Sequence, residues 1–192
     1  MSKVESTNVQ QIVLGVFERA KQVDEFEFAV AILDLTRGLR PHGPDDPLSE
    51  TELFVQDMIG LINAPLEEMT RIRLGLMAYV HMVESKPIYE ELANLLWIIA
   101  GGRAVPEPFA HLYRSKSGKP SVPPSAKRVV GFLSCLARAV GEDLLADELT
   151  GMLDDEIRNA VVHSDYFFHD RCFMTDQALR EFVTPKQRYS LR

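Results

Sequence analysis

The chain has 192 residues, a formal net charge of −7, 46% hydrophobic residues and 26% charged residues. This length and composition favour one folded domain over residues 1–192, and the negative charge argues against indiscriminate binding to nucleic acid. The two cysteines, Cys135 and Cys172, form no CxxC pair, which argues against a disulfide framework and a structural zinc site. The longest apolar run, residues 95–100, is too short to span a membrane. We therefore expect a cytoplasmic protein with no membrane partner.

Apolar residues at helical spacing, punctuated by capping residues, glycines and prolines, predict a string of helices. Asp24 with Glu27 forms one predicted helix start, and Ser49 to Glu52 forms a capping box for another. Pro65 suits the first turn of the helix that follows. The predicted helices cover about residues 9–21, 24–40, 49–62, 65–85, 87–100, 125–140, 143–153, 154–163 and 176–183.

Residues 103–124 form the one long irregular stretch, which contains five prolines. A loop of this length is longer than most connections within a compact domain, which indicates a functional or mobile segment. Residues 103–128 carry six basic residues and one acid, whereas residues 142–156 carry seven acids and no base. A solvated basic loop explains this pattern, and a basic surface facing an acidic helical region is the alternative.

After residue 163 the pattern changes to short aromatic stretches. Residues 166–168 and 171–173 flank His169 and Asp170, and this arrangement predicts a small β-hairpin. The predicted fold class is therefore all-α, a helical bundle with a small β-hairpin near the C-terminus.

Arg158, Asn159 and His163 lie at the end of the predicted helix over residues 154–163. On an ideal helix, Arg158 and His163 are separated by about 140° of rotation, so they do not share a face. Asn159 and His163, at positions i and i+4, do share one, and the amide could fix the imidazole tautomer. A plain structural explanation is also available, in which Asp154 and Asp155 pair with Arg158 and the helix dipole favours His163.

The segment Arg158-Asn159-x-x-x-His163, with Ile157 before it and Tyr166 after it, resembles the R-x4-6-H motif of the HEPN superfamily. The resemblance covers about residues 150–170, within a region of about 142–175, together with the all-helical context. It implies a HEPN-like helical bundle in which the motif lies near the end of a late helix.

The resemblance also implies metal-independent RNA cleavage at a homodimer cleft, of the defence or toxin type, with no cofactor. Arg158, Asn159 and His163 would then be catalytic: an imidazole can exchange a proton with the ribose 2′-hydroxyl, and a guanidinium can hold the phosphate. The candidate substrate contacts are Asp165, Tyr166 and Arg171. The implied partners are RNA, a second copy of the chain, and a protein partner or antitoxin.

Three observations keep other functions open. In HEPN toxins paired with nucleotidyltransferase antitoxins, a modifiable tyrosine is the second residue after the histidine, whereas Tyr166 is the third here. The acids before Arg158 are unfavourable for RNA, so a non-catalytic dimerisation or adaptor module is the alternative function. His163, Asp165, His169 and Asp170 are also metal-ligand types, but their spacing follows no regular metal-binding pattern, and no metal site is predicted.

Overall fold

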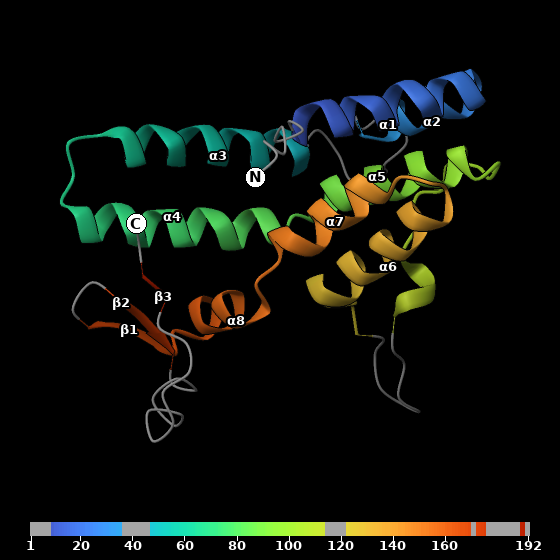
Figure 1. Ribbon diagram of the computed structural model, residues 1–192. Helices are drawn as coiled ribbons and strands as arrows, with labels where there is room; N and C mark the ends of the chain where they lie inside the picture. The colour runs from blue at the N-terminus through green and yellow to red at the C-terminus, as the bar shows by residue number, and fades with distance from the viewer. Residues whose placement is uncertain (1–8, 36–46, 114–121, 170–171, 176–188, 191–192) are drawn as a thin grey trace, which may run out of the picture. The chain divides into compact units, whose positions relative to one another are not determined.

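The computed structural model describes residues 9–35, 47–113, 122–169, 172–175 and 189–190. These residues are mostly helical, with a small antiparallel sheet close to the C-terminus (Figure 1). The predicted fold class, a helical protein with a short C-terminal hairpin, is confirmed. The predicted helix over residues 176–183 lies outside the described residues. Among the described residues, no helix combines the length and apolar character needed to cross a lipid bilayer.

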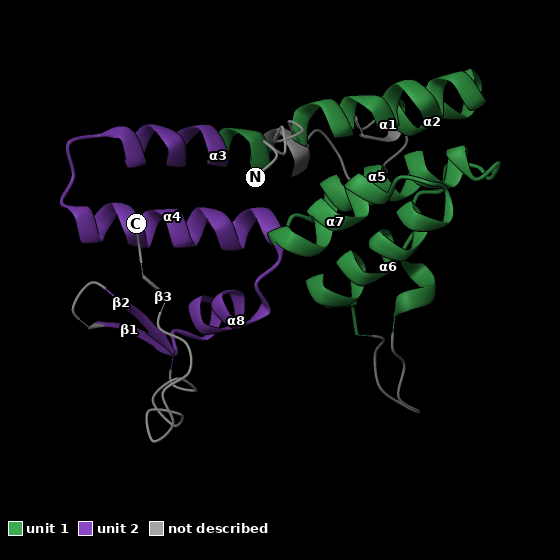
Figure 2. Cartoon of the chain, in the orientation of Figure 1, with its two compact units in different colours: residues 1–54, 84–152 green, residues 55–83, 153–192 purple. Residues whose placement is uncertain are grey.

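The chain divides into two compact units, each made of two separate stretches of sequence (Figure 2). Unit 1 comprises residues 1–54 and 84–152, and unit 2 comprises residues 55–83 and 153–192. The expectation of one domain over residues 1–192 stays a prediction. The motif residues Arg158, Asn159 and His163 all belong to unit 2.

Unit 1 is built around one buried helix, α5. Its other helices include α1, α2, α6 and α7, with the 3₁₀ turn η1. The bounds are α1 Val9–Val23, α2 Glu25–Leu35, α5 Lys86–Ile99, η1 Ala110–Leu112, α6 Ala126–Ala139 and α7 Asp143–Met152. Leu95, Leu96 and Ile98 of α5 are completely buried, and α1, α2 and α6 pack around this helix. A helix that is apolar on most of its faces needs neighbours on all of them, which explains its central position.

The predicted cap of α2 in unit 1 is found in place. The backbone N–H of Glu27 donates to Asp24 Oδ1 at 3.0 Å, so Asp24 caps α2 as expected. Trp97 of α5 packs near Phe132 of α6, with ring centroids 6.3 Å apart. Trp97 therefore has a packing role between helices.

The first half of the predicted irregular loop is tied to the core of unit 1. Asn94, which is 2% exposed, accepts from the backbone N–H of Val105 at 3.0 Å and donates to its carbonyl oxygen at 3.1 Å. Arg128 Nη1 donates to the carbonyl oxygen of Leu112 at 2.7 Å. The predicted loop is therefore partly anchored, and η1 interrupts it.

Unit 2 contains α4, the second part of α3, α8 and the sheet. The bounds are α3 Pro47–Asn63, α4 Glu68–Val83, α8 Asp155–His163, β1 Tyr166–His169, β2 Cys172–Thr175 and β3 Tyr189–Ser190. The sheet has the order β1-β2-β3, and β1 pairs with β2 in antiparallel register, Tyr166 opposite Thr175. α8 packs against α4 and β2. The predicted hairpin around residues 169–170 is thus confirmed.

Two predicted helix starts are wrong. α3 begins at Pro47, ahead of the predicted capping box at residues 49–52, because a proline is well tolerated in the first turn of a helix. α4 begins at Glu68, so Pro65 lies in the turn before the helix. Glu67 performs the capping there, since its carboxylate accepts from the backbone N–H of Met69 and from the Thr70 hydroxyl, each at 3.3 Å.

Candidate functional site

α8 carries the motif and is capped at both ends. Asp154 Oδ1 accepts from the backbone N–H groups of Glu156 and Ile157 at 3.0 and 2.9 Å, which satisfies two donors of the first turn. At the other end Ser164 adopts a left-handed conformation with φ 58°, and the backbone N–H of Asp165 donates to the carbonyl oxygen of Ala160. The helix therefore ends directly after His163, as predicted.

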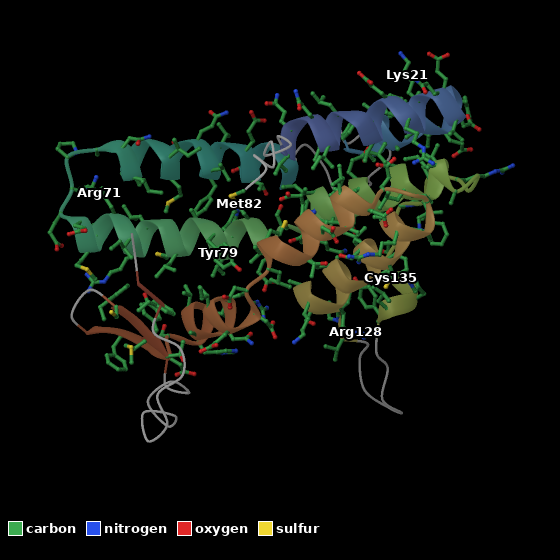
Figure 3. The ribbon with its side chains drawn as sticks, in the orientation of Figure 1. Lys21, Arg71, Tyr79, Met82, Arg128 and Cys135 are labelled. Atoms are coloured by element: carbon green, nitrogen blue, oxygen red, sulfur yellow. The ribbon has the colours of Figure 1, made fainter. Side chains whose placement is uncertain are left out.

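Tyr79 of α4, labelled in Figure 3, ties α8 to the rest of unit 2. The backbone N–H of Asp154 donates to the Tyr79 hydroxyl oxygen at 2.7 Å, and this hydroxyl donates to the carbonyl oxygen of Asp154 at 3.3 Å. Burial raises the pKa of Tyr79 above its ordinary value of 10.0, and the charges of Asp154 and Asp155 raise it further. The start of the motif helix is thus held by a side chain 75 residues away in sequence.

One face of α8 opens onto a pocket of about 420 Å³, which we call the α8 pocket. Its polar lining comes from the whole length of α8, from the turn after it and from the end of β2. The lining residues are Asp155, Glu156, Asn159, Ala160, His163, Asp165 and Thr175. Asp155, Asn159 and His163 follow one another at i, i+4 and i+8, so they line the same side of the helix.

The structure brings three of the predicted site residues together in one pocket. Asn159, His163 and Asp165 all line the α8 pocket. Arg158 is not among the lining residues, but its Nη1 donates to Asn159 Oδ1 at 2.7 Å. This hydrogen bond orients the Asn159 amide, whose nitrogen can donate and whose oxygen keeps a second lone pair. Arg158 is therefore linked to the pocket through Asn159.

Of the other two predicted substrate contacts, Tyr166 is described and is not among the lining residues. Tyr166 belongs to β1, and its ring stacks on that of Phe173 with centroids 5.2 Å apart and an interplanar angle of 24°. Phe168 meets both rings edge-on, and the guanidinium of Arg73 lies 5.8 Å from the Phe168 ring centroid. Tyr166 thus has a packing role in the sheet. Arg171 lies outside the described residues.

Sequence reasoning missed Asp155, Glu156 and Thr175 as members of the pocket. The i, i+4 spacing from Asp155 to Asn159 could have indicated the first of them. Nothing local could have indicated Thr175, because it reaches the pocket only through the packing of β2 on α8. Its hydroxyl donates to Glu156 Oε1 at 2.8 Å, and the residue is 4% exposed.

The described lining residues of the pocket are acidic on balance. Three carboxylates, those of Asp155, Glu156 and Asp165, line it together with the exposed imidazole of His163. A phosphate placed deep among these carboxylates would be repelled, whereas a neutral group with N–H donors or a cation would be attracted. Across the part of the chain that the structure describes, no group of three or more histidine, cysteine or acidic side chains is arranged to hold a metal ion.

Chemically, the two ends of the pocket differ. Among the described residues, the N-terminal end presents the carboxylates of Asp155 and Glu156, which are hydrogen-bond acceptors. The C-terminal end offers the imidazole of His163 and the amide of Asn159, each of which can donate or accept a hydrogen bond. Such an arrangement can orient a polar substrate and exchange a proton with it.

Comparisons with known proteins identify no relative: no family model, curated protein or solved structure matches this chain significantly.

Proposed function

We propose that the chain is a HEPN-like protein that cleaves RNA without a metal ion, at a cleft formed by two copies of the chain. The observation that supports this most directly is that Asn159 and His163 open onto one pocket while Arg158 is hydrogen-bonded to Asn159. These are the three residues through which the sequence resembles the HEPN motif. Their side chains supply a proton acceptor, a hydrogen-bond donor and a fixed positive charge.

In the proposed reaction, His163 removes the proton of a ribose 2′-hydroxyl, and the 2′-oxygen attacks the adjacent phosphorus. The bond from phosphorus to the 5′-oxygen breaks, and the leaving oxygen takes a proton from the protonated imidazole of a second copy's His163. The products are a 2′,3′-cyclic phosphate and a 5′-hydroxyl end. Proton transfer of this kind contributes about 10²- to 10⁴-fold to a rate.

The second copy also accounts for the position of Arg158. On an ideal helix, position 158 lies about 140° around the helix axis from position 163 of the same chain. A two-fold axis between copies of α8 would place the Arg158 of one copy across from the His163 of the other, where it could neutralise the phosphate and its transition-state charge. The added positive charges would also offset the carboxylates of the α8 pocket.

The experiment is a cleavage assay with single-stranded RNA in excess EDTA, with the cyclic phosphate end as the product measured. We expect His163→Ala and Arg158→Ala each to reduce the rate about a hundredfold or more. His81→Ala and Arg71→Ala change the same residue types at exposed positions of α4 outside the pocket, and should cleave like the wild type. Equal cleavage by the wild type and both motif variants, or no cleavage by a dimeric wild type, would contradict the proposal.

A non-catalytic dimerisation or adaptor module is the second candidate, and one observation favours it. Four large apolar side chains on the α3 and α4 parts of unit 2 are about half exposed: Ile59 at 53%, Leu61 at 48%, Met77 at 58% and Met82 at 49%. In an adaptor module, a bound protein would cover these side chains. In this case Ile59→Glu and Met77→Lys would abolish self-association or partner binding, and the motif variants would change stability only.

A further inference from the structure

The N-terminal end of the α8 pocket presents acceptors in fixed positions. Glu156 is held by the Thr175 hydroxyl at 2.8 Å, and Thr175 is 4% exposed, so this contact is shielded from water. At the middle of the helix, Asn159 is held by Arg158 in the same way. Polar side chains that are locked by neighbours lose little freedom when a ligand binds, which favours binding.

The two ends of the pocket are separated by about the length of one nucleotide. Glu156 and His163 are seven residues apart on α8, which corresponds to about 10 Å along the helix axis. Both line the same pocket. A nucleotide lying along this face could therefore place its base near Glu156 while its ribose and phosphate extend toward His163.

We propose that the α8 pocket binds an RNA base and selects guanine, and this inference rests on the proposed function. A carboxylate has only acceptors, and its two oxygens match a pair of adjacent N–H donors. Guanine offers such a pair on its Watson–Crick edge, N1–H and the 2-amino group. Adenine and cytosine each place a bare ring nitrogen beside their amino group, and uracil flanks its one N–H with two carbonyls. Recognition of this edge is the usual way in which proteins read unpaired RNA bases.

Guanine binding would give the acidic lining of the α8 pocket a role in the proposed RNA cleavage. A phosphate is excluded from the end at Asp155 and Glu156, whereas a neutral base with two donors is accepted there. The attacked ribose then belongs to the guanosine itself, because its 2′-hydroxyl extends toward His163. Cleavage is therefore expected on the 3′ side of guanosine in single-stranded RNA.

The binding test compares guanosine 3′-monophosphate with the adenosine, uridine, cytidine and inosine equivalents by calorimetry on the intact wild-type protein. Inosine lacks the 2-amino group and keeps everything else. A well-formed pair of hydrogen bonds to a base discriminates by about 5- to 150-fold, so the guanosine nucleotide should bind more tightly by a factor in this range. Equal binding of the guanosine and inosine nucleotides would overturn the inference.

Glu156→Gln supplies the second arm of the test. Glutamine still offers an oxygen to Thr175 but replaces one acceptor with a donor, so the preference for guanosine should disappear. Glu148→Gln makes the same change at an exposed position of α7 in unit 1 and should leave the preference intact. Persistence of the preference in a folded Glu156→Gln protein would also overturn the inference.

The two proposals fail separately. Guanosine-selective binding without RNA cleavage would support the pocket assignment and contradict the nuclease. EDTA-resistant cleavage that depends on His163 but shows no base preference would support the nuclease and overturn the guanine inference. Absence of both nucleotide binding and cleavage would overturn both.

Discussion

Arg158 donates a hydrogen bond of 2.7 Å to Asn159, its immediate neighbour on α8, and the two residues face different sides of the helix. Asn159 lines the α8 pocket and Arg158 does not. The contact therefore orients the amide, because one lone pair of its oxygen accepts from Arg158. Through it, a residue outside the pocket can influence the chemistry inside.

Asn159→Ala should lower the rate of RNA cleavage about a hundredfold, because the amide is the hydrogen-bond donor among the three motif side chains of the proposed mechanism. The rate should be measured under single-turnover conditions in EDTA. Asn63→Ala, at the exposed end of α3, is the matched control and should have no effect. An unchanged rate in Asn159→Ala would remove this residue from the mechanism.

Tyr79→Phe should lower the free energy of unfolding by about 1 kcal/mol or more, because the half-buried backbone N–H of Asp154 loses its acceptor. Urea unfolding gives the value directly. Tyr166→Phe keeps the ring that stacks on Phe173, so it should change the stability by only a few tenths of a kcal/mol. A cost that is the same for both variants would mean that the Tyr79 hydroxyl does not hold α8.

The contribution of Tyr79 to the free energy of unfolding should also depend on pH in the alkaline range. Its pKa in the folded protein is raised above 10.0, chiefly by burial, so folding favours the protonated phenol. The stabilisation is then fully present below pH 10 and is lost as the pH rises through the folded-state pKa. The difference in unfolding free energy between wild type and Tyr79→Phe should shrink above pH 10 and stay constant from pH 7 to 9. A difference that grew with pH would reverse the assigned direction.

Asp154→Ala should destabilise the protein by about 1 kcal/mol, since Asp154 caps the first turn of α8 with two hydrogen bonds. Asp154→Asn retains an acceptor oxygen, so it should destabilise the protein by only a few tenths of a kcal/mol. Thermal unfolding of the three proteins at pH 7 measures both values. If the two variants were equally destabilised, the charge of Asp154 would be responsible instead of the cap.

Asn94→Ala should destabilise unit 1 by about 2–4 kcal/mol. The substitution removes two hydrogen bonds to Val105 and leaves the partly buried backbone groups of that residue without their partner. Hydrogen exchange of the Val105 amide should accelerate in the variant. A stable variant with unchanged exchange would show that the loop after α5 is held by other contacts.

Local sequence patterns predicted most of the helices and the hairpin because their causes are local. Asp24 caps α2, and α8 ends directly after His163, as the spacing of capping and apolar residues indicated. The starts of α3 and α4 were wrong because prolines fit both a first turn and the loop before it. The start of α4 is set by Glu67, whose side chain caps the helix from a position after Pro65.

The site could be predicted only in part. The shared face of Asn159 and His163 follows from helix periodicity, and the structure confirms it. The contacts of Thr175 with Glu156 and of Tyr79 with Asp154 depend on residues 19 and 75 positions away, which no local pattern reveals. The direction of the Arg158 side chain depends on its rotamer, which spacing along a helix leaves open.

The interleaving of the two units has a consequence for synthesis on the ribosome. α4 is made before residues 84–152, whereas α8, which packs against it, is made after them. At ordinary translation rates this interval lasts on the order of several seconds. During that time the face of α4 that later contacts α8 is uncovered, and an uncovered apolar helix is prone to aggregate. The nascent chain should therefore depend on chaperones most strongly between the emergence of α4 and that of α8.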